Sequence, residues 1–238
     1  MIRLLYKYVH RLLRALGYQL VPASSFLQSQ DVVELIISKG GIVKNIYDIG
    51  AHKGEWTLAI SRYLNNDTKI TMFEPSASHQ GILNEISNRY GYRFIQMALG
   101  KSSGFFSFYT SGGTGDSFYE EVESENKQGI PTKLIEVETL DNVIERFTLQ
   151  PPDLLKLDCQ GSELDILKGG KETLGKVSSI ILEASILECN IGAPLMGEVV
   201  SFLELHGFYP ISLSEVHNRT GILKQIDLVF LNRNLLYK

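Results

Sequence analysis

The sequence Ile46-Tyr47-Asp48-Ile49-Gly50-Ala51-His52-Lys53-Gly54 decides the fold, because a short apolar run leads directly into a glycine turn. Helix-like spacing follows Gly54, so this stretch predicts a buried strand, a tight turn and a helix. A second apolar run, Ile70-Thr71-Met72-Phe73, ends in Glu74, which puts a carboxylate at the tip of the next strand. A glycine turn beside a strand-end acid indicates a site for a nucleoside cofactor.

The glycine spacing bears on the kind of cofactor. Asp48, Gly50 and Gly54 form D-x-G-x-x-x-G, whereas the dinucleotide fingerprint is G-x-G-x-x-G, so S-adenosylmethionine fits better than NAD. We expect the glycines to let the cofactor approach the backbone or to relieve strain in the turn, and Glu74 to accept both ribose hydroxyls. Asp48 could orient the loop or accept from the ammonium of the methionine moiety. Glu74 alone could be a solvated carboxylate, and only the combined pattern favours cofactor binding.

Length and composition are those of one globular unit. The chain has 238 residues, 44% of them hydrophobic, which suffices for a substantial core. Its formal net charge of −4 gives no overall attraction to nucleic acid, so we expect no nucleic-acid partner. Cys159 and Cys189 form neither a disulfide framework nor a zinc spacing, and no apolar run is long enough to span a membrane. We therefore expect a cytoplasmic protein.

Residues 1–40 are predicted to form a helical arm that precedes the domain at 41–238. Within it, basic residues recur on one face of a helix and leucines and a valine on the other: Arg3, Lys7, Arg11 and Arg14 against Leu5, Val9, Leu12 and Leu16. Such a helix could lie on the inner face of an anionic membrane, but helices of this kind more often pack their apolar face on the domain. We favour packing and keep peripheral membrane contact as the alternative.

Strand-like and helix-like segments alternate through the first half of the domain. Strands are expected at 45–50, 69–74 and 92–98, and helices at 31–39, 55–64 and 78–90. Two further strand-like runs, 104–109 and 132–137, read as an inserted hairpin. The Gly- and Ser-rich stretch 111–117 between them is either a lid on the substrate side or a plain surface loop.

The second half supplies four more strands, at 153–158, 179–183, 208–213 and 225–231, with a helix at 195–206. Asp158 and Glu183 end two of these strands at the edge where open α/β sheets bind ligands, and Lys156 is expected to pair with Asp158, Asp48 or another carboxylate. Ser162 and Asp165 have the spacing of a helix capping box. The short connection before residue 225 makes the last strand antiparallel.

The order of the motifs resembles the FkbM-type methyltransferase family over most of the chain. The resemblance rests on Asp48-x-Gly50-Ala51-x-x-Gly54-x-Trp56, Phe73-Glu74-Pro75, Ala98-Leu99-Gly100, Thr139-Leu140-Asp141, Asp153 to Glu163 and Asp227-Leu228-Val229-Phe230. Its most specific part is K-x-D-x-x-G-x-E, from Lys156 to Glu163. The implied fold is a Rossmann-like class I methyltransferase: α/β, with a seven-stranded, mostly parallel, doubly wound sheet and an antiparallel last strand.

The resemblance implies methyl transfer from S-adenosylmethionine, most often to a hydroxyl of a sugar, a glycan or a natural product. It places the cofactor against Asp48, Gly50, Ala51, Gly54, Glu74, Ala98 and Asp158. A base near the acceptor hydroxyl is expected, with Asp158 as the first candidate and then Glu183 and Glu163. His217, in a late loop, is a further candidate. No metal is expected.

Two other functions stay open at this point. The domain could bind the cofactor without turnover, as a scaffold, because a fold does not imply activity. An NAD-dependent oxidoreductase is the weaker enzyme alternative. The acceptor and the oligomeric state are left open.

Overall fold

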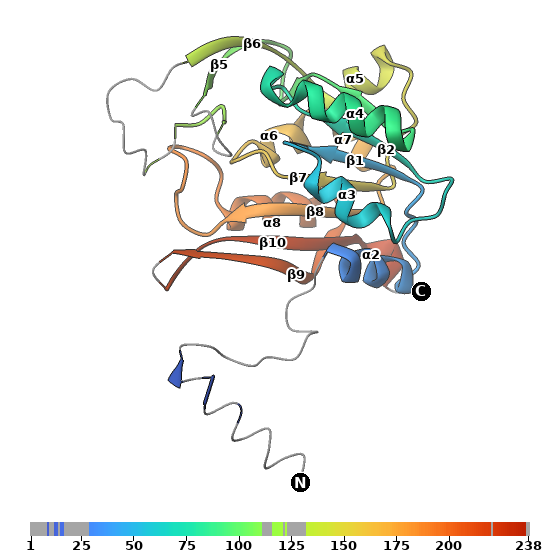
Figure 1. Ribbon diagram of the computed structural model, residues 1–238. Helices are drawn as coiled ribbons and strands as arrows, with labels where there is room; N and C mark the ends of the chain where they lie inside the picture. Colours follow the sequence, from blue (N-terminus) through green and yellow to red (C-terminus); the bar gives the residue numbers. More distant parts are fainter. Residues whose placement is uncertain are drawn as a thin grey trace.

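A seven-stranded sheet with helices on both faces forms the body of the protein in the computed structural model (Figure 1). The structure describes residues 29–110, 116–120, 122, 132–219 and 221–236, together with 9, 12, 13, 15 and 16. The strand order is β3-β2-β1-β7-β8-β10-β9. The strands are β1 (Asn45–Ile49), β2 (Lys69–Phe73), β3 (Arg93–Ile95), β7 (Leu154–Leu157), β8 (Ser179–Ser185), β9 (Phe208–Arg219) and β10 (Ile222–Asn232).

Strand direction agrees with the prediction. The pairs β1–β2, β1–β7, β2–β3 and β7–β8 are parallel, and β10 is antiparallel to both of its neighbours. The predicted seven-stranded, mostly parallel sheet with an antiparallel last strand is therefore confirmed. Because parallel strands end at one edge, β1, β2, β7 and β8 bring their carboxyl ends together there.

Strand alternation divides the core into two clusters, one on each face of the sheet. On β1, Ile46 belongs to one cluster and Tyr47 and Ile49 to the other. The first cluster includes side chains of α2 (Ser29–Ser38), α3 (Glu55–Ser61) and α4 (Gln80–Tyr90), which follows the short 3-10 helix η2 (Ala77–His79). The second includes α5 (Leu140–Arg146), α6 (Glu163–Lys168), α7 (Lys171–Leu174) and α8 (Met196–Leu205). The short helix α9 (Arg233–Leu236) follows β10. The sheet is thus doubly wound.

The expected third strand divides between two sheets. Residues 93–95 form β3, but Ala98 and Leu99 form β4 (Ala98–Leu99) of a separate three-stranded sheet. Since β2 ends at Phe73, opposite Ile95, the main sheet offers no partner to the residues that follow. Instead β4 pairs in parallel with β6 (Thr132–Glu138), which pairs antiparallel with β5 (Gly104–Tyr109) as the predicted hairpin.

The final two strands are longer than predicted. β9 continues to Arg219 and β10 begins at Ile222, with register shifts between them that absorb extra residues. His217, which we expected in a loop, is therefore paired with Gln225 in the sheet. A strand position holds its side chain at a fixed place relative to β10.

The residues before the domain are described in part. Val9, Leu12 and Leu16 have exposed fractions of 39%, 64% and 64%, so these side chains are not packed into the core, contrary to the packing that we favoured. The basic side chains at positions 3, 7, 11 and 14 lie outside the described residues, and membrane contact stays a prediction. In the described part of the chain, no helix has the length and apolarity to cross a bilayer.

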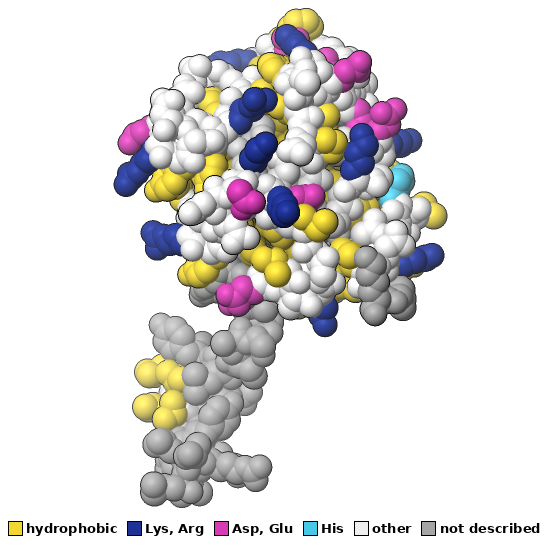
Figure 2. All heavy atoms as spheres, turned by 90° about the vertical axis from the view of Figure 1, so that its right-hand side faces the viewer, with side chains coloured by type: hydrophobic (Ala, Val, Ile, Leu, Met, Phe, Trp, Pro, Cys, Tyr) yellow, Lys and Arg dark blue, Asp and Glu magenta, His cyan; other side chains and the backbone are white. Residues whose placement is uncertain are grey.

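Helix α2 falls within residues 1–40 but packs into the domain. Val32, Val33 and Ile36 are at most 1% exposed and share a cluster with Ile46 of β1. The boundary that we placed after residue 40 therefore cuts off a helix of the core. Most of the predicted lid, residues 111–115, lies outside the described residues. On the face in Figure 2, Lys and Arg side chains are dispersed among acidic and apolar groups, without a continuous basic patch among the described residues.

Candidate functional site

The turn after β1 begins with Gly50, in a conformation that favours glycine. Its φ is +80°, and an added Cβ would lie 1.9 Å from the backbone oxygen of Asp158. Gly54 also has positive φ, +78°, but its missing Cβ makes room for Ile86 of α4. Gly50 thus lets the ends of β1 and β7 approach each other, while Gly54 lets α4 pack behind the turn.

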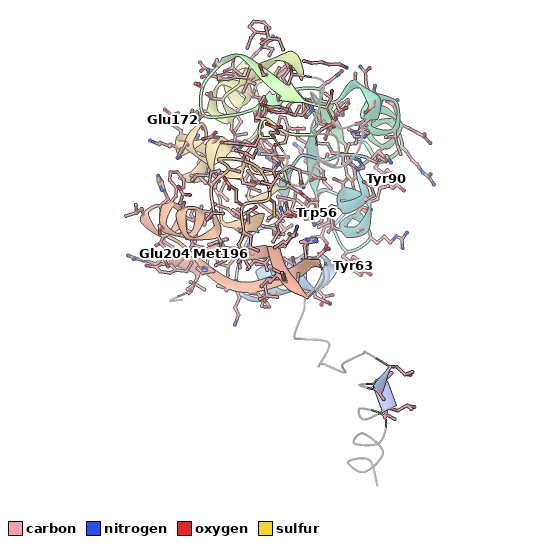
Figure 3. The ribbon with its side chains drawn as sticks, turned by 90° about the vertical axis from the view of Figure 1, so that its left-hand side faces the viewer. Trp56, Tyr63, Tyr90, Glu172, Met196 and Glu204 are labelled. Atoms are coloured by element: carbon pink, nitrogen blue, oxygen red, sulfur yellow. The ribbon has the colours of Figure 1, made fainter. Side chains whose placement is uncertain are left out.

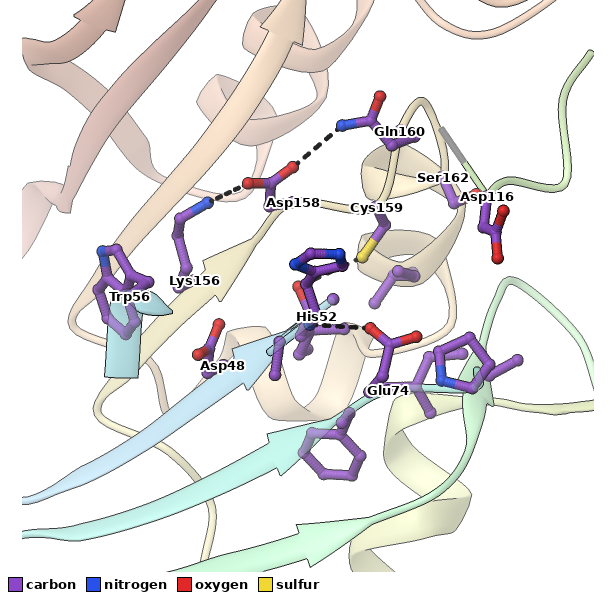
Figure 4. Close-up of a pocket in the computed structure, with 18 of the residues that line it drawn as sticks. Asp48, His52, Trp56, Glu74, Asp116, Lys156, Asp158, Cys159, Gln160 and Ser162 are labelled. Carbon is purple, nitrogen blue, oxygen red and sulfur yellow. Dashed lines mark hydrogen bonds and ion pairs between the residues drawn. The ribbon is translucent and has the colours of Figure 1, made fainter. Parts of the chain in front are cut away.

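Glu74 stands directly after β2 with its carboxylate held by two backbone amides. The N–H of His52 donates to Oε2 at 2.9 Å (Figure 4). The N–H of Ser76 donates to Oε1 at 2.9 Å. Beside it, Nδ1 of His79 lies 3.7 Å from Oε1 and has no hydrogen-bond partner among the described residues. Glu74 is 7% exposed. The two groups form a preorganised polar corner with capacity for further hydrogen bonds.

A cavity of about 430 Å³ opens at the carboxyl edge of the sheet. Its size is in the range of small-molecule and cofactor sites. Seven residues predicted as cofactor contacts or candidate bases line it: Asp48, Gly50, Ala51, Glu74, Ala98, Asp158 and His217. Gly54, Glu163 and Glu183 do not appear in its lining. Local sequence patterns therefore predicted most of the residues at the strand tips that line one wall of the cavity.

Trp56, at the start of α3, lines the cavity and also packs against the core cluster on its face of the sheet. In Figure 3 it lies near the middle of the view, whereas Tyr63, Tyr90 and Glu204 lie toward its edge, and its side chain is partly buried. Core filling, which we favoured for Trp56, and a place in the pocket wall are thus both observed.

Aromatic side chains near the three-stranded sheet form another part of the cavity wall. Phe108 of β5 and Phe118 line the cavity, with ring centroids 5.0 Å apart and planes at 70°. Phe108 is 6% exposed, whereas Phe105 is 67% exposed and takes no part. The cavity therefore has a polar wall at the strand tips and an apolar wall beside the insertion.

Lys156 is the buried cation of the site. It is paired in register with Asp48, and its Nζ lies 3.2 Å from Oδ2 of Asp158 and 4.0 Å from Oδ2 of Asp227. Burial acts to lower the pKa of Lys156, but the carboxylates of Asp158, Asp227 and Asp48 hold it above its ordinary value. The lysine stays protonated, and the 3.2 Å contact selects Asp158 from the partners that the sequence left open.

Asp48 and Asp158 differ in their electrostatic surroundings. Burial raises the pKa of Asp48 to about 6, against an opposing hydrogen bond at 2.6 Å from Thr57 Oγ1. For Asp158 burial acts in the same direction, but Lys156 and a hydrogen bond from Gln160 Nε2 hold its pKa below the ordinary value. Asp158 is therefore an ionised, weakly basic carboxylate facing the cavity.

Glu163 braces the loop that follows Asp158. Its two oxygens accept hydrogen bonds from the backbone amides of Cys159 at 2.6 Å and Gly161 at 3.0 Å, and burial raises its pKa to about 7. The expected capping box is absent from this helix start, because Ser162 Oγ is buried without a described partner and Asp165 accepts from Tyr119 Oη. The Glu163 carboxylate instead holds the backbone of the loop that precedes the helix.

Glu183, His217 and Asp227 form a cluster next to the cavity. Nε2 of His217 lies 3.7 Å from Oε1 of Glu183 and 3.6 Å from Oδ1 of Asp227. Burial and nearby carboxylates raise the pKa of Glu183 to about 8, and a hydrogen bond to Asp227 raises that of His217 to about 9. Nε2 groups of Gln160 and Gln225 donate to Oε2 of Glu183 at 3.3 and 2.7 Å.

Several cavity residues were not predicted. Asp227, His79 and Gln160 line the cavity, and His52 and Gln160 have φ of 49° and 51°, which is rare for residues other than glycine. Such backbone conformations concentrate at functional sites. Aligning the final hairpin against the strand at 179–183 could have brought Asp227 beside Glu183; no local signal marks His79 or Gln160.

The strand order, the glycine turn and the acidic tip of β2 define a Rossmann-like class I methyltransferase fold. The chain belongs to the methyltransferase FkbM domain family, whose model matches residues 48–210. This confirms the family resemblance noted in the sequence.

Two relatives are named as methyltransferases. The hexuronic acid methyltransferase AglP of Haloferax volcanii is 28% identical over 65% of this chain, and the match spans 61% of that protein's length. The 2-O-methyltransferase NoeI of Sinorhizobium fredii is 26% identical over 69% of this chain, and the match spans 71% of that protein's length.

Solved structures share the fold. The N-terminal domain of EvdMO1, crystallised in the presence of SAH and D-fucose, superposes with a TM-score of 0.50 at 12% identity, covering 86% of this chain and 82% of that one. At this identity the likeness concerns the fold alone.

Proposed function

We propose that this protein transfers a methyl group from S-adenosylmethionine to a hydroxyl of a sugar, a glycan or a related natural product. The observation that carries the proposal is the polar corner at Glu74, at the tip of β2 and beside the Gly50 turn. In a doubly wound sheet this edge is where a nucleoside ligand binds. The family membership supports the reaction class.

The residues of the polar corner fit the adenosyl half of the cofactor. With one backbone amide on each oxygen, the Glu74 carboxylate is fixed in orientation and keeps lone pairs for two ribose hydroxyls. Nδ1 of His79, which has no hydrogen-bond partner in the described part of the chain, offers a further polar contact to the same ligand. Gly50 and Ala51 add no bulky side chain to this wall.

The acidic floor fits the charge of the cofactor. When bound, S-adenosylmethionine supplies a methyl group activated by a sulfonium, along with an ammonium. Asp158 is ionised and faces the cavity, so it can hold a cationic group or accept a hydrogen bond from the acceptor hydroxyl. Of the three carboxylates considered as bases, only Asp158 lines the cavity, and it remains our first candidate.

The acceptor class is supported by the relatives and by the shape of the cavity. One relative is named for a hexuronic acid and the other for 2-O-methylation. The rings of Phe108 and Phe118 offer an apolar surface against which the face of a sugar ring could pack, opposite the polar groups.

Cofactor binding is the first test. Titration calorimetry of the full chain with S-adenosylmethionine, S-adenosylhomocysteine and NAD should give binding of the two adenosyl ligands. Glu74→Gln is expected to weaken it at least tenfold, because one ribose acceptor is replaced by an amide, while Glu85→Gln on the exposed side of α4 leaves it unchanged. Binding of NAD alone would refute the proposal, and binding of none of the three would favour a scaffold.

Turnover is the second test. Methyl transfer should be measured with a panel of neutral sugars and hexuronic acids, and product analysis should place the methyl group on a hydroxyl rather than on a carboxylate. Asp158→Asn separates two roles: loss of turnover with cofactor affinity retained assigns Asp158 to the acceptor, and loss of affinity assigns it to the cofactor. Cofactor binding without transfer to any sugar would overturn the acceptor class and keep the cofactor.

A further inference from the structure

Two buried carboxylates face each other across strands β8 and β10. Glu183 and Asp227 are direct partners in the antiparallel register and are 8% and 7% exposed. Like charges directly opposite each other destabilise a sheet, and burial increases the cost. A pair of this kind is stable only when one group holds a proton or when a positive charge lies between or beside the two.

His217 brings a third ligand atom to the same place. It is paired with Gln225, so it lies diagonal to Asp227 on the same face of the sheet. One oxygen of each carboxylate and one nitrogen of His217 all lie within 4.8 Å of one another. Neighbouring ligands of an octahedral ion with bonds of about 2.1 Å are about 3 Å apart and opposite ones about 4 Å. Small side-chain rotations would therefore complete three coordination bonds.

Lys156 is not placed to neutralise this pair, and the positive charge that lies beside both carboxylates is a protonated His217, whose proton a metal ion would replace. Lys156 Nζ lies 3.2 Å from Asp158 but 4.0 Å from Asp227, and its contact with Asp227 is through Oδ2, the oxygen not turned toward His217. The donors on Glu183 are the neutral amides of Gln160 and Gln225, and both bind Oε2, leaving Oε1 directed at His217. Each carboxylate thus keeps one oxygen for the shared point.

We propose that Glu183, Asp227 and His217 bind a divalent metal ion at the wall of the cavity. One imidazole nitrogen and two carboxylate oxygens suit a cation such as Mn²⁺ or Mg²⁺. His217 and Asp227 line the cavity, so the side of the ion away from the protein would be open to water or to a ligand oxygen. The strands β8, β9 and β10 carry one ligand each, which gives the site a rigid frame.

A metal ion here would polarise an acceptor hydroxyl. Asp158 is a weak base, and a bound cation lowers the pKa of an oxygen that coordinates it, so the two would act together on one proton. This role rests on the proposed function, whereas metal binding itself does not depend on it. The two can therefore fail separately.

Metal binding is tested on the chelator-treated full chain with Mn²⁺ as the probe. Titration calorimetry, and electron paramagnetic resonance of the free ion, should show one site per chain. Pulsed resonance of the complex should show coupling to an imidazole nitrogen. Glu183→Gln, Asp227→Asn and His217→Gln should each lower the affinity at least tenfold, and His217→Gln should abolish the nitrogen coupling. His217 has a 43% exposed side chain, so this variant is expected to fold.

The control is Glu215→Gln. Like Glu183→Gln, it removes one negative charge, but from a residue of the cavity wall that is not a proposed ligand. It should retain the affinity within about threefold, since a nearby charge adds less than a coordination bond. Absence of a stoichiometric Mn²⁺ site in the wild-type chain would overturn the proposal, as would equal loss in the control and the ligand variants. Titrating S-adenosylhomocysteine into the same samples tests the proposed function independently.

Discussion

Lys156 determines whether the carboxylates around it can stay buried and ionised. Its side chain is 3% exposed and its neighbours are Asp158, Asp227 and Asp48. Lys156→Met should lower the free energy of unfolding at neutral pH by about 3 kcal/mol, because uncompensated charges remain in the interior. Lys69→Met, at an exposed position of β2, should change it by less than about 0.5 kcal/mol.

The measurement is urea denaturation of both variants at about pH 7 and about pH 5. The loss in free energy of unfolding caused by Lys156→Met should be smaller at the lower pH, because Asp48 takes up a proton there. A cost that is the same at both pH values would mean that lost packing, not charge, is responsible.

Glu163 should make stability depend on pH. Burial raises its pKa from 4.5 to about 7, so the folded state holds the proton more tightly than the unfolded state. The resulting stabilisation is complete below about pH 4.5 and is lost as the pH rises through about 7. Between about pH 5 and pH 8 the free energy of unfolding of the wild type should fall by on the order of 2 kcal/mol more than that of Glu163→Gln.

Urea denaturation across this pH range, for the wild type, Glu163→Gln and the exposed Glu85→Gln, measures the difference. The Glu85 variant should follow the wild type. Parallel curves for all three chains would show that Glu163 keeps an ordinary pKa in the folded state.

At the scale of the elements, the turn between β1 and α3 depends on the missing side chain of Gly50. Gly50→Ala places a Cβ 1.9 Å from the Asp158 carbonyl oxygen in a residue with φ of +80°. Gly91→Ala has a similar φ of +72° but nothing within 4 Å. The Gly91 variant should cost about 1 kcal/mol of stability from backbone strain alone, and the Gly50 variant several times more, because β1 and β7 must separate.

The comparison needs thermal and urea unfolding of both variants, with S-adenosylhomocysteine titrations beside them. Only Gly50→Ala should reduce ligand affinity. Equal costs for the two variants would mean that the turn relaxes around the added carbon.

The elements differ from the sequence prediction where a partner strand decides the outcome. Apolar periodicity located β1, β2, β7 and β8, since a buried parallel strand is a local apolar run. It missed the break at Gln96 and Met97, because the break depends on where β2 ends. Apolar periodicity also predicted β9 and β10 too short. The outer parts of these two strands are polar and pair with each other. The capping box failed at Ser162 because Ser162 Oγ has no partner among the described residues and the Asp165 carboxylate accepts from Tyr119 Oη, a contact that local spacing does not show.

At the scale of the whole molecule, the domain should require helix α2. Val32, Val33 and Ile36 are at most 1% exposed and cover the first core cluster. Burying each such side chain contributes about 1.5–3 kcal/mol, so a fragment of residues 41–238 should be less stable than residues 29–238 by on the order of 5 kcal/mol. Thermal unfolding followed by circular dichroism measures this, and equal midpoints would show that α2 is dispensable.

The site was predictable on one side only. Asp48, Gly50, Glu74 and Asp158 lie at strand tips of a parallel sheet, so chain order alone brings them together. The cluster of Glu183, His217 and Asp227 depends on the register of three strands, which a single sequence does not fix. For the same reason the cavity wall at Phe118 could not be derived from the loop composition.

The position of β10 between β8 and β9 has a consequence for synthesis on the ribosome. β10 follows all the other described strands in the chain, yet β9 joins the sheet only through it. Until residues 222–232 emerge, β8 ends the sheet with an unpaired edge and β9 has no neighbour, which exposes the nascent chain to aggregation and to chaperones. Asp227 arrives with that strand, so the cavity gains this part of its lining only when the last of the described strands is in place.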